Sequence, residues 1–158
     1  MHTFRMYVAP YSNTCGGRWL DLETDDVEAD VSAISRNGAL EVGAFDYEGF
    51  GSIRTESVME LIELAKAALT SQDAEAFVAY VSRTGQDAAS AEGEFDDAYC
   101  GHWDDEGAFA VDLADEVMDI PERIRPYFDD ERFARDLFLS DYFSAHSAKG
   151  GVFVFRHV

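Results

Sequence analysis

The segment from Glu92 to Asp141 most constrains what this chain can fold into, because it combines dense negative charge with regularly placed apolar residues. It holds 17 of the 32 acidic residues and only four bases, all arginines, for a formal charge of −13. It also carries aromatic residues throughout, among them Phe95, Trp103 and Phe133. A disordered acidic tail lacks such apolar content. The segment is therefore predicted to fold and to keep a dense anionic surface.

The whole chain has 158 residues, 47% of them hydrophobic, which is enough to build a packed core. No apolar stretch approaches 18 residues and no leader pattern is visible, so a soluble, cytoplasmic protein without a membrane partner is expected. Cys15 and Cys100 are too few for a disulfide scaffold and are interpreted as thiols in a reducing cytosol.

The formal charge of the chain is −20, from 12 bases and 32 acids. A protein this acidic repels nucleic acid and anionic membranes, so direct DNA binding is not expected. It can attract a cation, a basic peptide or the basic groove of another protein. Acidity as a mere solubility trait, as in proteins of salty cytoplasm, is one alternative. The uneven spread argues against it, since six acids fall in 50–91, 17 in 92–141 and none later.

Alternation of Phe4, Met6 and Val8 with polar residues predicts a strand at the N-terminus. Ser57 and Glu60 have the spacing of a capping box, and apolar residues from Val58 to Leu69 follow at helical spacing. The expected elements up to residue 93 are strands over 3–9 and 18–22, a short helix ending at 37–38, a strand over 40–45, an exposed loop over 46–51, helices over 58–69 and 73–83, and a soft linker over 86–93.

In the acidic segment, Asp104 or Asp105 is expected to cap a helix with Phe109, Leu113, Ala114 and Val117 facing inward. The remaining expected elements are a short helix over 95–99, a break at 100–101, a short helix between Pro121 and Pro126, a helix capped by 129–130 with Phe133, Leu137 and Phe138 buried, and a buried strand over 152–155. Together these elements predict an α+β fold divided into three small subdomains, and the family resemblance described below implies that they form an elongated chain. The predicted subdomains are 1–54, β-rich; 55–97, helical; and 98–158, acidic and α/β.

Catalytic chemistry finds little support in the sequence. Gly49 and Gly51 lack the third glycine of a dinucleotide fingerprint, and no Gly-x-Ser-x-Gly elbow occurs. Cys100 and His102 are a lone pair of possible zinc ligands. The run from Asp104 to Gly107 misses the alternating acids of a calcium loop, and helix capping explains it better. No catalytic residue, cofactor or metal is predicted, and the protein is not expected to be an enzyme.

The charge density itself suggests a function. B-form DNA carries one negative charge per roughly 1.7 Å of axis, so twenty charges at that spacing need about 34 Å, and a two-fold dimer about 68 Å. A string of small subdomains would approach this density, with carboxylates standing in for phosphates. The alternative from physics alone is that the helices merely have solvated faces.

Several stretches resemble the ArdA-type antirestriction proteins, in order and at similar spacing over nearly the whole chain. They are Phe4–Ala9, the run from Tyr11 through Gly16-Gly17-Arg18-Trp19 to Leu22, Phe45–Phe50, Tyr99-x-Gly101-x-Trp103-Asp104 and, most specifically, Pro121–Leu137, which is similar to the family's antirestriction motif. The resemblance implies a homodimeric, elongated DNA mimic without active site or cofactor. Such proteins occupy the DNA-binding groove of the methyltransferase core of Type I restriction-modification enzymes, and block restriction and often modification. They are typically carried by mobile genetic elements.

Two sets of residues are therefore candidates for partner binding. The DNA-mimic carboxylates are expected to act collectively, and they are Asp21, Asp25, Asp26, Glu28, Asp46, Glu48, Asp97, Asp104, Asp105, Glu106, Asp112, Asp115, Glu116, Asp119, Glu122, Asp129, Asp130 and Glu131. The motif residues are expected to serve binding, self-association or fold integrity, and they are Pro121, Tyr127, Phe128, Phe133, Arg135, Asp136 and Leu137. The alternative function is an acidic binding module for another basic DNA-binding protein, such as a transcription regulator or nucleoid protein.

Overall fold

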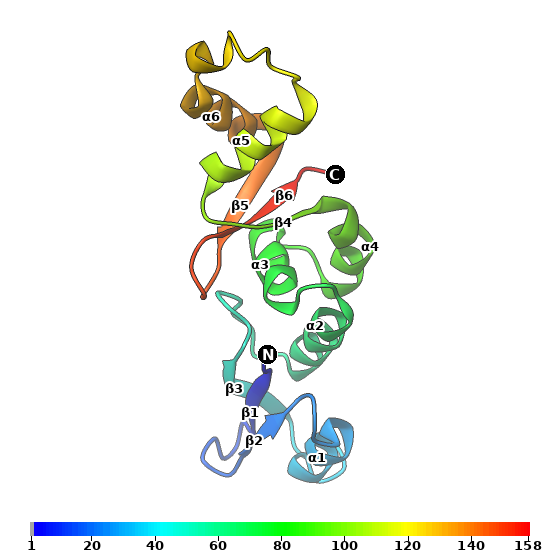
Figure 1. Cartoon of the computed structure of the whole chain (residues 1–158). Coiled ribbons are helices and arrows are strands. Elements are labelled where there is room, and N and C mark those ends of the chain that lie inside the picture. Colours follow the sequence, from blue (N-terminus) through cyan, green and yellow to red (C-terminus); the bar gives the residue numbers. More distant parts are fainter. Residues whose placement is uncertain (1) are drawn as a thin grey trace. The chain divides into compact units, whose positions relative to one another are not determined.

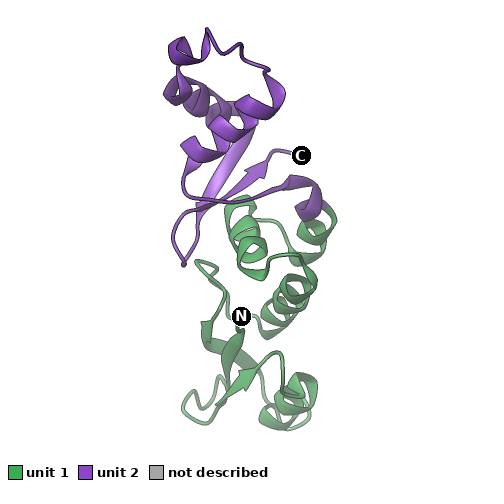
Figure 2. Cartoon of the chain, viewed as in Figure 1, with its two compact units in different colours: residues 1–93 green, residues 94–158 purple. Residues whose placement is uncertain are grey.

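The computed structural model describes residues 2–158 and divides into two compact units, 1–93 and 94–158 (Figures 1 and 2). Each unit contains one three-stranded antiparallel sheet together with helices, which confirms the predicted α+β class. The finer division into three subdomains with boundaries at 54 and 97 stays a prediction.

The sheet of unit 1 has β1 (Arg5–Pro10) in its centre, between β2 (Arg18–Asp21) and β3 (Val42–Glu48). Both neighbours pair antiparallel with β1. Met6 and Val8 are fully buried, as their alternation predicts. Backbone pairing of β1 along both edges therefore anchors the N-terminal part of the chain.

Three helices of unit 1 begin at side-chain caps. Helix α1 (Val27–Ile34) packs against β1 and β2, α2 (Val58–Thr70) contacts β3, and α3 (Ala74–Thr84) packs on α2. The side chains of Ser57 and Asp73 accept the N–H groups that open α2 and α3, as N-cap residues do. These caps confirm the starts of both helices.

The sheet of unit 2 has the order β4 (Tyr99–Trp103), β6 (Val152–Arg156), β5 (Tyr142–His146), all antiparallel. Helices α5 (Glu106–Val117) and α6 (Asp130–Ser140) pack on one another; α5 contacts β4 and β6, and α6 contacts β5. The buried terminal strand predicted at 152–155 is confirmed and lies in the middle of the sheet.

Strand β6 supplies apolar side chains to both faces of its sheet. Val152 and Val154 belong to a cluster with Phe109 of α5. On the alternate positions, the ring of Phe155 lies 6.3 Å from that of Phe95 and 5.2 Å from that of Phe143. Because successive side chains of a strand point to opposite faces, this one strand organises two layers of packing.

Two predictions about unit 1 are wrong. The loop expected from Asp46 is strand, because β3 keeps pairing with β1 as far as the Arg5–Glu48 pair and turns only at Gly49, where φ is +92°. The soft linker expected over 86–93 is the beginning of helix α4 (Ala88–Ala98). Its first turn is capped by the Asp87 carboxylate, which accepts the Ser90 N–H at 2.8 Å.

Local backbone predictions also fail in unit 2. Cys100 and Gly101 do not break the chain but lie in β4, at a bulge that Gly101 allows with φ of +100°. The helix expected after Pro121 is a turn followed by the short 3-10 helix η1 (Arg125–Tyr127), which contains Pro126 rather than ending before it. Strand β5 was not predicted.

Val117, which was expected to face inward, is 71% exposed, and Leu69, the last residue of the apolar pattern over 58–69, is 40% exposed. The buried positions of α2 end at Ala68 and those of α5 at Ala114. Helix α6 has no fully buried residue, so Phe133, Leu137 and Phe138, which were expected to be buried, are only half-buried. Periodicity identifies the apolar face of a helix but not where its packing partner ends.

The first prediction concerns the strand at the centre of unit 2. Phe155→Ala should lower the free energy of unfolding by about 3 to 5 kcal/mol, because it removes a fully buried ring. Urea unfolding followed by circular dichroism measures this change. Leu139→Ala, at an exposed site, is the control and should change stability little. Equal effects of the two substitutions would contradict the assignment of β6 to the core.

A candidate partner-binding surface

The predicted carboxylates are almost all available to solvent. Sixteen of the 18 are exposed, and Asp21 and Asp130 are half-buried. Each unit has 16 acids and six bases, a formal charge of −10, although unit 2 has only 65 residues. The charge is therefore more concentrated in unit 2, while both units present an anionic surface.

In unit 1 the carboxylates cluster where β2 leads into α1, and on β3. Asp21 accepts two backbone N–H groups, and Asp26 caps α1 by accepting the Ala29 N–H at 3.3 Å. Glu48 lies 3.4 Å from Arg5 and Glu28 lies 3.7 Å from Lys66, both as exposed ion pairs. Such pairs contribute little to stability and exchange readily for other partners. These acids are held in place locally yet remain open to a competing cation.

In unit 2 the carboxylate groups of seven predicted residues accept no hydrogen bond from residues 2–158 and form no ion pair with them. They lie at the end of α4, before α5, on the outer side of α5, in the following loop and in the first turn of α6. They are Asp97, Asp104, Asp112, Glu116, Asp119, Glu122 and Glu131. Because nothing in the described chain neutralises them, their charge is free to attract a basic partner.

Two other acids of unit 2 open helices. Asp105 accepts the Ala108 N–H at 2.7 Å and Asp129 accepts the Arg132 N–H at 3.0 Å. An acid at a helix N-terminus also interacts favourably with the helix dipole. Capping therefore explains Asp105, as predicted, and it places these two charges on the surface without loss of helix stability.

Arg125 is a residue of the acidic segment whose structural contacts the sequence did not predict. Its guanidinium donates to Asp130 at 2.9 Å, lies 3.5 Å from Asp115, and sits over the Phe128 ring at 5.4 Å. The side chain is only 29% exposed. Arg125 thus connects α5 to the start of α6 and holds the intervening loop. The available signal was its position as one of only four bases in the acidic segment, but spacing alone did not indicate its partners.

The predicted motif residues divide between packing and exposure. Phe128 and Phe133 pack with ring centroids 5.4 Å apart, and Leu137, four residues after Phe133 on α6, is half-buried. Pro121, Arg135 and Asp136 are exposed, with Arg135 lying 3.8 Å from Asp136. Tyr127 is 86% exposed. The motif therefore contains both fold-supporting side chains and side chains available for contact.

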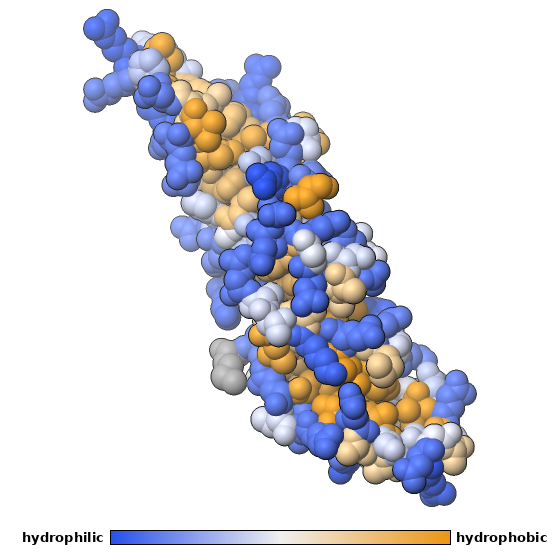
Figure 3. Space-filling view, turned by 90° about the vertical axis from the view of Figure 1, so that its right-hand side faces the viewer, coloured by the Kyte–Doolittle hydropathy of each residue, from blue (hydrophilic) through white to orange (hydrophobic). Residues whose placement is uncertain are grey.

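Unit 2 also exposes apolar side chains near its acids, namely Val117, Met118, Ile124, Tyr127 and Leu139. A groove of about 480 Å³ lies between α5, α6 and β5, with Leu113, Phe133 and Leu137 in its lining. On the face drawn in Figure 3, hydrophilic side chains cover most of the surface and hydrophobic areas interrupt them. Val117 and Met118 of this set line the groove, which makes it the most apolar candidate contact of unit 2. Sequence periodicity had assigned Val117 to the interior.

The groups considered for catalysis and metal binding are engaged locally. Cys100 donates to the Ala98 carbonyl at 3.3 Å, and burial raises the pKa of its thiol, which disfavours the reactive thiolate. His102 Nε2 lies 2.7 Å from the Gly150 carbonyl oxygen. Among residues 2–158, no three His, Cys, Asp or Glu side chains are placed to hold a metal ion. No helix within these residues is long and apolar enough to span a membrane.

Comparison with known proteins identifies one family. A family model described as "Antirestriction protein (ArdA)" matches residues 7–153. The match covers most of the 158 residues, including both units and the Pro121–Leu137 motif, and it shows the family. A search of curated proteins finds no match.

The second prediction tests Arg125 as the connection between the two helices. Arg125→Ala should lower the free energy of unfolding by about 1 kcal/mol, because two carboxylates lose a partly buried partner. Arg132→Ala removes a more exposed arginine whose pair with Asp136 is 3.9 Å long, and should have almost no effect. Urea unfolding compares the two variants at low salt. Similar small changes in both would show that Arg125 has no special structural importance.

Proposed function

We propose that this chain, which belongs to the ArdA family of antirestriction proteins, inhibits Type I restriction-modification enzymes by occupying their DNA-binding groove as a mimic of B-form DNA. The observation that carries the proposal is the set of seven exposed carboxylates of unit 2 without a partner among residues 2–158. Family membership supplies the antirestriction activity, and the inhibitor character of the family fits a protein that is not an enzyme. The negative charge of the exposed carboxylates is the physical basis of the proposed DNA mimicry.

The mechanism rests on how proteins hold DNA. Half to two-thirds of protein–DNA hydrogen bonds go to phosphate and sugar, and lysine and arginine supply much of the positive charge that meets them. A surface of carboxylates on helices offers those side chains the same charge in place of phosphates. With −10 on each unit, the chain can compete for a groove whose affinity is largely electrostatic. Inhibition of modification would follow from the same contact, because the methyltransferase core reads DNA in that groove.

A second step of the proposal is that the protein acts as a homodimer. The exposed apolar residues of unit 2 lie beside strongly negative surface, and an isolated chain gains nothing from presenting them to water. A two-fold contact would bury the same patch on both copies. Self-association through Val117, Tyr127 and their neighbours would double the negative surface offered to the enzyme.

The alternative is an acidic binding module for another basic DNA-binding protein, such as a transcription regulator or nucleoid protein. The same unpaired carboxylates support it. The two functions differ in the protein that this chain displaces from duplex DNA, so a panel of purified partners tested in one displacement assay separates them.

The third prediction tests DNA mimicry by displacement. A purified Type I methyltransferase core holding a labelled duplex should release it when this protein is titrated in, and the displacement should weaken as salt rises. Asp112→Lys with Glu116→Lys should raise the concentration needed for half displacement about tenfold or more, because attraction becomes repulsion on the outer side of α5.

The matched control is Glu41→Lys with Glu92→Lys, which changes the net charge equally at exposed acids outside the predicted surface. It should raise that concentration by less than about threefold, since charges outside the contact act on the partner only through screened long-range attraction. Equal losses in both variants would point to net charge rather than a defined surface. Absence of displacement at every salt concentration, with folded protein, would remove the mechanism for the enzyme tested.

The fourth prediction tests the dimer. Sedimentation equilibrium should give about twice the 17.6 kDa mass of the chain, and Val117→Asp with Tyr127→Asp should shift the mass toward one chain. Met59→Asp, at an exposed apolar site on α2 of unit 1, should leave the mass unchanged. A single-chain mass for the unmodified protein at micromolar concentration would contradict self-association.

A further inference from the structure

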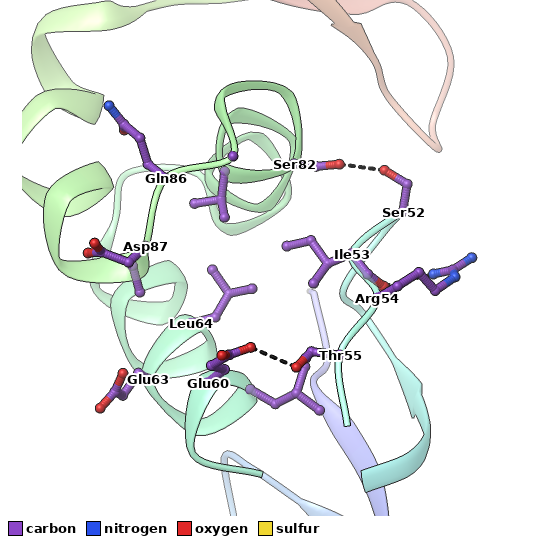
Figure 4. A pocket seen from close by; sticks show the side chains of 14 residues that line it. Ser52, Ile53, Arg54, Thr55, Glu60, Glu63, Leu64, Ser82, Gln86 and Asp87 are labelled. Carbon is purple, nitrogen blue, oxygen red and sulfur yellow. Dashed lines mark hydrogen bonds between the residues drawn. The ribbon is translucent and has the colours of Figure 1, made fainter. Parts of the chain in front are cut away.

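Unit 1 contains a cavity whose lining residues belong neither to the predicted carboxylates nor to the motif. It has a volume of about 510 Å³ and lies between the segment 52–55, helix α2, the end of α3 and the turn into α4 (Figure 4). The apolar part of its wall is formed by Ile53, Leu61, Leu64 and Val81, while Ser52, Thr55, Ser82 and Gln86 are polar lining residues. Ile53 and Leu64 point into it (Figure 4). A long side chain with an apolar stem would find complementary walls here.

The rim of this cavity is negatively charged. Glu60, Glu63 and Asp87 line it, and Arg54 is the single base among its lining residues. Arg54 does not neutralise the rim, because its guanidinium is turned away from the cavity and donates to the Ile53 carbonyl at 2.8 Å (Figure 4). The rim therefore favours a cation.

The rim carboxylates differ in how they are held. Hydrogen bonds from Ser90, first from its N–H and then from its hydroxyl, lower the pKa of Asp87 and keep that carboxylate ionised. Glu60 accepts the Thr55 hydroxyl at 2.6 Å, which fixes its position. Glu63 is exposed and has no side-chain partner within the described residues. One carboxylate is thus held ionised, one is oriented, and one is free to bind.

We propose that this cavity receives an arginine side chain from the basic groove that the protein occupies, an inference that rests on the proposed function. The methylene stem lies against Ile53, Leu64 and Val81, and the guanidinium bonds the rim carboxylates. Arginine combines an apolar stem with a planar, always charged fork suited to carboxylates, and it is more weakly hydrated than lysine. Charge complementarity and the apolar walls together select it over an anion or a purely apolar residue.

The cavity lies in a part of the chain that has few acidic residues for mimicking phosphates. Residues 50–91 contain only six acids, so phosphate mimicry is thinnest in this part of the chain. A DNA backbone can offer phosphates to an arginine but no apolar pocket for its stem. The cavity would therefore add a contact that DNA does not make, and specificity for one class of enzyme would follow from it.

The fifth prediction tests arginine binding directly, independent of any enzyme. The full-length protein labelled with ¹⁵N is titrated with the peptide acetyl-Gly-Arg-Gly-amide, and amide shifts are followed by NMR. Shifts should concentrate at residues that line the cavity, and the citrulline peptide, which has the same shape without the charge, should cause none. An arginine peptide that moves no lining amide, or moves them no more than the citrulline peptide, overturns the proposal.

A matched pair of variants locates the site. Ala88→Phe places a ring in the cavity lining without changing charge, whereas Ala89→Phe adds the same ring at a neighbouring exposed position that does not line the cavity. The first should abolish the peptide-induced shifts and the second should keep them. Thermal unfolding by circular dichroism checks that both variants fold. Retained shifts in a folded Ala88→Phe variant overturn the assignment to this cavity.

Displacement of duplex DNA from the methyltransferase core separates this inference from the proposed function. Ala88→Phe should raise the concentration for half displacement at least about fivefold relative to Ala89→Phe, as expected for a buried anchor. If the two variants displace equally well, the arginine contact with the enzyme is overturned while DNA mimicry stands. If the unmodified protein displaces nothing yet binds the peptide, the proposed function fails, and the groove is not the source of the arginine.

Discussion

Burial of the central strand β6 is the constraint on which unit 2 depends. The unit carries a formal charge of −10 in 65 residues, and mutual repulsion of these charges opposes compaction. Four consecutive buried residues of β6, Val152 to Phe155, supply apolar area to both faces of the sheet and offset that repulsion. The acids can then be dense on the surface because none of them is required in the core.

The acids themselves also contribute to the fold. Asp26, Asp73, Asp87, Asp105 and Asp129 each cap a helix, so five negative charges satisfy backbone N–H groups that would otherwise lack partners. Arg125 adds a cation where α5 approaches α6. Stability and surface charge are therefore compatible at these five sites, because they are helix N-termini, where negative charge is favourable.

The sequence predicted those features that depend on local chemistry. The α+β class, the caps at Ser57 and Asp129 and the buried strand at 152–155 follow from spacing and residue type, and the structure confirms them. The candidate carboxylates could be named from the sequence because acids are easily counted, and 16 of the 18 are exposed. The predictions that failed depend on long-range pairing. Strand at 46–48 requires β1, and the exposure of Val117 depends on where the covering elements end.

Charge alone leaves a question of selectivity, to which the proposed arginine contact at the cavity of unit 1 would give one answer. Coulombic attraction to a basic groove is long-ranged and tolerant, so a purely anionic surface would bind many DNA-binding proteins. Apolar contacts act only at close range and require matching shape. An inhibitor that first approaches by charge and is then retained by an arginine in a fitted pocket would discriminate among basic grooves that have equal net charge. Selectivity in such a protein would then depend on residues 50–91, which contain only six acids. Salt weakens their apolar contacts least.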